Sequence, residues 1–213
     1  MKKIAVLLLA VVLFTACASK PAEETPEPVP AEPAPSPAPV AAPEIVSGEW
    51  REIDGGYTQF LCNDPELTGN IFVKPFAPAN ENEYAIEVQK ISGNNQGEFG
   101  MIFCVNETNP ILFYFVGIDM NGYFYIGKRT ETEWQEIIAW QPADMLNMGA
   151  EAVNTIKVVR DNNDFSVFFN DSETASAAFT DTEMTGTRIG FYAQVTGASY
   201  ETFPDTPVDV RFK

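Results

Sequence analysis

The chain has 213 residues, with 30 acidic against 13 basic side chains and a net charge of −17 at neutral pH. A chain this acidic repels the phosphate backbone of nucleic acids, and its sequence has no basic cluster, so nucleic acids are excluded as partners. It also has no histidine. This excludes Ser-His-Asp and Cys-His catalytic centres and removes the commonest metal ligand. We therefore expect neither a metal nor a cofactor.

Residues 1–16 are predicted to be a signal peptide. Lys2 and Lys3 precede the apolar run Ile4–Phe14. That run is shorter than the roughly 20 residues needed to span a bilayer, but it fits the core of a secretory signal. The following residues Phe-Thr-Ala-Cys resemble the lipobox of bacterial lipoproteins, with Phe14 in place of the usual leucine. In that family the cysteine, here Cys17, becomes N-terminal and lipid-modified, and palmitate is one of the acyl groups.

An ordinary cleavage after Ala18 stays open as an alternative, because Ala16-Cys17-Ala18 also has the A-x-A pattern. The lipobox resemblance implies a bacterial envelope protein that contacts the membrane through its N-terminal lipid. Ala18 is not the aspartate that retains some lipoproteins at the inner membrane. The outer membrane or the cell surface is therefore the favoured location.

Residues 17–46 are predicted to be a linker. Nine of the chain's sixteen prolines lie in Lys20–Val46. Proline fixes the backbone and removes an amide donor, so this segment is expected to be disordered, extended and semi-rigid. A spacer that holds a folded domain away from a membrane is the favoured interpretation, and a Pro-rich recognition motif is the alternative.

Residues 47–213 are predicted to form one all-β domain, because apolar residues recur every second position rather than every 3.6. An Asn-Gly pair and the run Asp161–Asp164 have the composition of tight hairpin turns. Only Pro142–Met148 favours a short helical turn. The expected strands, in chain order, are 57–62, 70–76, 82–91, 99–105, 111–118, 122–130, 134–140, 154–160, 165–170, 187–195 and 208–212. So many short strands predict a two-sheet antiparallel jelly-roll sandwich.

The order of these segments resembles the concanavalin A-like lectin/glucanase superfamily, in its laminin-G-like form. The resemblance covers 84–195 and rests on FGMIFCV, ILFYFVGIDMNGYFYIGKR, WQEIIAW, NTIKVVRDNNDFSVFFND and TRIGFYAQV. Asp171 stands where the family usually has glycine, and the last strand lacks an aromatic-Asp-Asp lead-in. Members of the family bind glycans or proteins, hydrolyse polysaccharides or act as structural modules, so the resemblance does not choose between these roles. We favour a non-catalytic domain that recognises a glycan or an envelope partner. A polysaccharide-active enzyme and a purely structural envelope module remain alternatives.

Aromatic side chains on neighbouring strands are the candidate ligand-binding residues, because sugars stack on exposed rings. Trp140 and Phe113 are assigned to the core. Trp134, with Glu136, Ile138 and Trp140, is expected on one strand face. The candidates are Trp134, Tyr123, Tyr125 and Tyr114.

The acidic stretch Glu131–Glu136 has the acid spacing of some glucanase centres. A retaining glycosidase needs two carboxyl groups about 5–5.5 Å apart, one of them tuned as an acid. Here the acids straddle a predicted turn, so no catalytic residue is assigned.

Asp161–Asp164 is interpreted as a turn rather than a calcium site. Cys62 and Cys104 have no zinc spacing; they form either a disulfide or two buried thiols.

Overall fold

The structure is a computed structural model, and it describes residues 45–46, 49–62, 64–78, 80, 82–195 and 208–213. The predicted signal peptide, Cys17 and nearly all of the linker lie outside these ranges. In the described part, no helix is long and apolar enough to cross a membrane.

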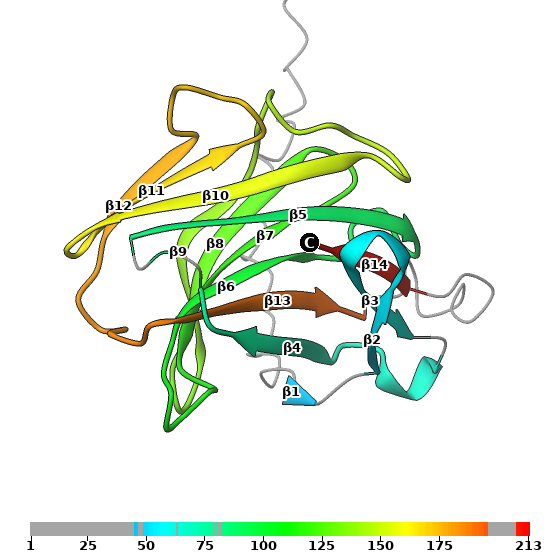
Figure 1. Cartoon of the computed structure of the whole chain (residues 1–213), viewed down its shortest axis with the longest axis horizontal. Helices are drawn as coiled ribbons and strands as arrows, with labels where there is room; N and C mark the ends of the chain where they lie inside the picture. Colours follow the sequence, from blue (N-terminus) through cyan, green and yellow to red (C-terminus); the bar gives the residue numbers. More distant parts are fainter. Residues whose placement is uncertain (1–44, 47–48, 63, 79, 81, 196–207) are drawn as a thin grey trace, which may run out of the picture. The chain divides into compact units, whose positions relative to one another are not determined.

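The residues form two seven-stranded sheets packed face to face (Figure 1). Sheet A has the order β1-β4-β13-β6-β7-β8-β9, and sheet B has the order β12-β11-β10-β5-β14-β3-β2. Neighbouring strands are antiparallel except for the parallel pair β1 and β4. Sheet A comprises β1 (Ile45–Val46), β4 (Ile71–Phe76), β6 (Phe99–Val105), β7 (Phe113–Ile118), β8 (Tyr123–Arg129), β9 (Trp134–Pro142) and β13 (Arg188–Gln194). Sheet B comprises β2 (Trp50–Ile53), β3 (Tyr57–Cys62), β5 (Glu83–Ser92), β10 (Val153–Asp161), β11 (Asp164–Phe169), β12 (Ala177–Thr180) and β14 (Val208–Phe212).

The core lies between the sheets, because apolar residues at alternate positions of each strand point toward the opposite sheet. In β6, Phe103 faces inward and packs its ring against Tyr84 and Phe165 of sheet B. In β5, Tyr84, Ile86 and Val88 are buried at alternate positions, as a strand with one core face requires. The all-β sandwich predicted from the sequence is confirmed.

The segment 142–148 differs from its prediction, because it forms turns rather than a helical turn. Its backbone is held by other elements. The Ala143 amide donates to Gly122 O, and the Asn147 amide donates to the buried side chain of Asn154. Three short strands, β1, β2 and β12, were not predicted, because two to four residues are too few to show a period.

Asp161–Asp164 forms the β10–β11 hairpin turn, as predicted. Asp161 pairs with Asp164, and Asn162 has a left-handed backbone with φ of 56°. Asparagine is among the residues that tolerate this conformation best.

Candidate functional site

The outer face of sheet A, which is turned away from sheet B, carries a second group of aromatic side chains. Phe113, Phe115 and Tyr192 form a cluster separate from the main core, with Tyr125 and Trp134 packed against it. They alternate with core residues such as Tyr114 and Val116, so they lie on the opposite face of the same strands. Both faces of β7 are therefore apolar, as its unbroken hydrophobic sequence predicts.

A pocket of about 760 Å³ opens at one end of this outer face. Its lining residues come from the loop before β6, the β7–β8 turn, β9 and the end of β13. They are Gln96, Glu98, Asp119, Asn121, Tyr123, Trp140 and Gln194. The pocket thus combines two aromatic rings with three amides and two carboxyl groups.

Trp140 and Tyr123 provide the exposed apolar surface of this pocket, because each is 43% exposed. The Trp140 ring is backed by Tyr125, with the ring centroids 5.6 Å apart and the planes at 28°. A flat ring fixed from behind and open in front is the arrangement on which the apolar face of a sugar can stack.

The prediction that Trp140 lies in the core is wrong. The pairing of β8 with β9 shifts register on both sides of Ile126, and this breaks the simple alternation along β9. Ile138 consequently packs on the main core, while Trp140 stacks on Tyr125 of the outer face. The expectation that Ile138 and Trp140 share one face is wrong for the same reason.

The four predicted ligand-binding aromatics have different environments. Tyr123 lines the pocket, and Tyr125 supports Trp140 from behind. Trp134 is half-buried outside the pocket, edge-on to Phe113 and Phe115. Tyr114 is fully buried in the core, so it is not available to a ligand. Phe113 is buried as predicted, but on the outer face rather than between the sheets.

Glu98 forms part of the pocket wall and is only 9% exposed. Burial raises the pKa of Glu98 to about 7; a hydrogen bond with Tyr192 acts in the opposite direction, and Asp119 raises it further. The Oε1 atom of Glu98 has no hydrogen-bond partner. The Glu98 side chain lies over Gly117, where a Cβ would be 2.0 Å from Glu98 Oε1. Only a glycine in β7 leaves room for this carboxyl group.

Asp119 has a different environment. Its Oδ1 accepts hydrogen bonds from the amides of Asn121 and Tyr123, both at 2.9 Å. Its Oδ2 accepts from Asn121 Nδ2 at 3.2 Å. These bonds shape the β7–β8 turn and fix the Tyr123 backbone beside the pocket.

Lys90, on β5 of sheet B, holds the loop that carries Gln96 and Glu98. Its Nζ donates to Asn94 O and Gly97 O, both at 2.7 Å, and lies 5.5 Å from the Phe99 ring centre. Burial lowers the pKa of Lys90 to about 7, while Asp119 acts in the opposite direction. Lys90 is a positioning residue, because it fastens the pocket loop to the other sheet.

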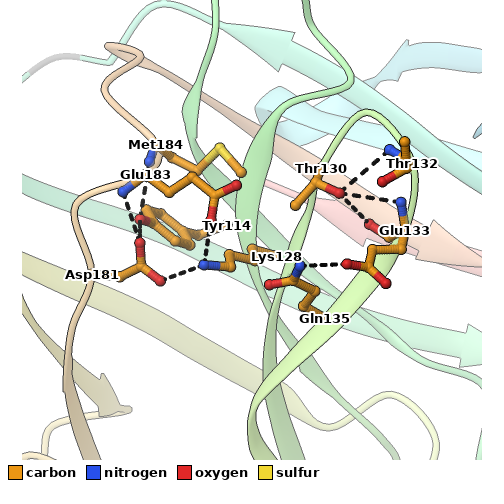
Figure 2. A network of polar contacts seen from close by, with 9 residues as sticks. All are labelled: Tyr114, Lys128, Thr130, Thr132, Glu133, Gln135, Asp181, Glu183 and Met184. Atoms are coloured by element: carbon orange, nitrogen blue, oxygen red, sulfur yellow. Dashed lines mark hydrogen bonds and ion pairs between the residues drawn. The ribbon is translucent and has the colours of Figure 1, made fainter.

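The stretch Glu131–Glu136 lies away from this pocket, at the β8–β9 turn. Thr130 Oγ1 accepts hydrogen bonds from the Thr132 and Glu133 amides, and Glu133 accepts from Gln135 (Figure 2). These residues serve the turn and give no pair of converging carboxyl groups. The acids lie in the β8–β9 turn and at the start of β9, as the sequence predicts.

Next to that turn, the inner side of sheet A carries a separate ionic network. Lys128 lies 2.6 Å from both Asp181 and Glu183, and the Tyr114 hydroxyl donates to Asp181 at 2.7 Å (Figure 2). Tyr114 also accepts the Met184 amide. The network joins the 181–184 segment to sheet A, and its role is structural.

Cys62 and Cys104 are both buried and both free, so the structure contains no disulfide between them. They lie on different sheets, in β3 and β6. Burial raises the pKa of Cys104 to about 11, so its thiol stays protonated and unreactive in the folded protein. The structure favours the alternative of two buried thiols.

The sequence did not single out Gln96, Glu98, Asp119, Asn121 or Gln194 as ligand-binding residues. Glu98 immediately precedes the apolar β6, where a charged residue has the pattern of an ordinary strand boundary. One signal was present: Gly117 interrupts an apolar strand, and a glycine inside a strand marks a site where another group approaches closely.

Comparison with known proteins finds similarity in structure only. The carbohydrate-binding module CBM66 from Bacillus subtilis has 12% sequence identity and a TM-score of 0.57, over 78% of this chain and 89% of the module. The Bacillus licheniformis beta-glucanase has 9% identity and a TM-score of 0.52, over 83% and 85% of the two chains. The fold is a concanavalin A-like jelly roll. No protein-family model and no curated protein sequence matches this chain.

Proposed function

We propose that this protein is an envelope lipoprotein whose jelly-roll domain binds a glycan in the outer-face pocket. One observation carries the glycan proposal: the half-exposed Trp140 and Tyr123 rings lie in one pocket with amides and carboxyl groups. Rings that stack on a sugar face, beside groups that bond its hydroxyls, are the usual composition of a sugar site.

The fold supports this proposal without deciding it. One structural neighbour is described as a carbohydrate-binding module and the other as a beta-glucanase. At these identities the similarity concerns the fold alone, and one fold carries many activities. The pocket residues of this chain are therefore the stronger support.

The test is binding of the full chain to a panel of polysaccharides, with Trp140→Ala and Met145→Ala as a matched pair. Trp140→Ala removes the stacking surface, and we expect it to weaken binding at least about tenfold, which corresponds to about 1.4 kcal/mol. Met145 is also exposed but does not line the pocket, so its variant should bind like the wild type. Absence of binding to any glycan would overturn the proposal.

A glycoside hydrolase is the second candidate, because two carboxyl groups in different environments line the same pocket. Glu98 is a buried acid with a raised pKa, as a general acid requires. Asp119 is held by the turn. Release of reducing ends from the same panel, lost in Glu98→Gln, would establish hydrolysis; binding without release would leave recognition as the function.

A further inference from the structure

The charge distribution in the pocket restricts which sugars fit it. Of the lining residues, Glu98 and Asp119 are acidic, and none is a lysine or arginine. Arg129 lies at the opposite end of β8 from Tyr123, and Lys90 uses its ammonium on two backbone carbonyls behind the loop. An anionic ligand would therefore enter next to carboxyl groups with no cation in the lining to compensate it.

Glu98 adds a second, independent observation. A buried carboxyl oxygen without a partner is unfavourable, because its lost hydration is not replaced. Asp119 is satisfied by three donors, and the other groups around Glu98 leave its Oε1 unpaired. A ligand that brings a hydrogen-bond donor to the Glu98 carboxyl group would offset this cost.

We propose that the pocket selects a sugar residue that is neutral or carries a free amino group and that it rejects acidic sugars. The Glu98 carboxyl group accepts the hydroxyl or ammonium hydrogen of the bound sugar. This inference rests on the proposed glycan function and adds the substrate class. Stacking on Trp140 supplies affinity that does not depend on charge. The carboxyl groups supply the discrimination between uncharged or cationic sugars and uronic or sulfated ones.

The charged and titratable groups that face Glu98 come from three elements. Tyr192 on β13 hydrogen-bonds to it, Asp119 follows β7, and Tyr125 lies on β8. Burial, then Glu136 and Glu98, raise the pKa of Tyr125 to about 12, and burial raises the pKa of Tyr192 well above its usual value. Between pH 5.5 and 8.5 both tyrosines therefore stay neutral.

Affinity for a neutral sugar should consequently rise with pH over this interval. A hydroxyl donates more strongly to a carboxylate than to a carboxylic acid, so binding favours ionised Glu98. We expect affinity to increase about three- to tenfold from pH 5.5 to 8.5.

The experiment compares three matched β-1,4-linked hexasaccharides on the full chain by titration calorimetry. They are cellohexaose, its C6-oxidised uronate form and the fully deacetylated glucosamine hexamer. We expect binding of cellohexaose, of the glucosamine hexamer or of both, and at least about tenfold weaker binding of the uronate form. Binding of the uronate form as tight as that of cellohexaose would overturn the inference and leave the proposed glycan function standing.

Two variants test the role of Glu98 itself. Glu98→Gln keeps the shape of the side chain but cannot ionise. It should therefore remove the pH dependence of sugar affinity and reduce the difference in affinity between cellohexaose and its uronate form. Gly117→Ala displaces the Glu98 carboxyl and should weaken binding, while Glu131→Gln in the β8–β9 turn is the control. If Glu98→Gln retains the pH dependence and the discrimination, Glu98 has no part in selection. If no sugar in the wider panel binds wild-type protein, the proposed function itself fails.

Discussion

At the scale of single residues, two buried ionisable side chains near the pocket have strongly displaced pKa values. Glu98 and Lys90 have pKa values displaced toward neutrality from opposite sides, each chiefly by burial. The chain has no histidine, so no imidazole titrates in the same interval. The pH dependence of stability near neutrality should therefore report on these two groups.

The first stability prediction concerns Glu98. Its pKa is raised above the unfolded value of 4.5, so the folded state binds the proton more tightly. The resulting stability is present below pH 4.5 and is lost as pH rises through about 7. We expect the free energy of unfolding to fall by roughly 2–3 kcal/mol over this interval. Urea unfolding between pH 4.5 and 7.5 measures it.

Glu98→Gln supplies the control for this prediction, because it removes the titration and should flatten the profile. Lys90 acts only above neutral pH and in the other direction. The pKa of Lys90 is lowered in the folded protein. Its contribution to the free energy of unfolding therefore increases as the pH rises from about 7 toward 10.5, the pKa in the unfolded chain. If the free energy of unfolding of the wild type rose steadily from pH 4.5 to 7.5, the buried position of Glu98 would be contradicted.

At the scale of elements, the periodicity of the sequence predicted the strands well where both the length and the alternation were sufficient. The prediction for β6 matches its observed bounds, Phe99–Val105, and the β7–β8 turn lies at the Asn-Gly pair. The side-chain directions in β9 were not predictable, because its register shift depends on pairing with β8 and leaves no mark in local sequence. This one irregularity decides that Trp140 belongs to the pocket.

The residues that line the pocket could not be predicted from the sequence either, because strand pairing brings them together. Gln96, Asp119 and Gln194 come from segments far apart in the chain, and only the pairing of β13, β6 and β7 brings them together. Tyr123 was among the candidates because aromatic residues gather on the neighbouring predicted strands. Glu98 was not, since its burial depends on Gly117 in the next strand.

A prediction at this scale concerns the loop between β9 and β10. Asn154 is 2% exposed; its side chain accepts from the Asn147 amide at 2.8 Å and donates to Asn147 O at 2.9 Å. Asn154→Ala leaves both groups without these partners, so we expect a loss of about 2 kcal/mol in the free energy of unfolding. Asn147→Ala removes an exposed side chain and its hydrogen bond to Val153 O, and it should cost under about 1 kcal/mol. Equal losses in urea unfolding would show that Asn154 does not hold the loop.

At the scale of the whole molecule, the sequence predicts a signal peptide and a Pro-rich linker ahead of the folded domain. The sandwich is built from the described residues between 45 and 213, and the lipobox, Cys17 and the Pro-rich segment remain sequence predictions. Under the proposed function, these segments would hold the pocket at the end of a spacer on a membrane. The acidic composition fits a domain that stays off anionic lipid surfaces.

The prediction at this scale is that Cys17 carries the lipid. Cys17→Ser should abolish incorporation of a labelled fatty acid in a bacterial host and release the protein from the membrane fraction. The folded domain should keep its unfolding midpoint, because residue 17 lies outside the described sandwich. Ala18→Ser is the matched control and should be labelled normally. Labelling that persists in Cys17→Ser would exclude this anchor.

The loop before β6 joins the two sheets as well as lining the pocket. Lys90 of sheet B holds its carbonyls, while Asn95 O accepts the Met120 amide and Glu98 O accepts the Gln194 amide in sheet A. The loop therefore belongs to the cooperative unit of the sandwich and should detach only when the sheets separate. A ligand that meets such a pre-ordered rim loses little entropy in ordering it, and heat abolishes recognition only at the temperature that melts the fold.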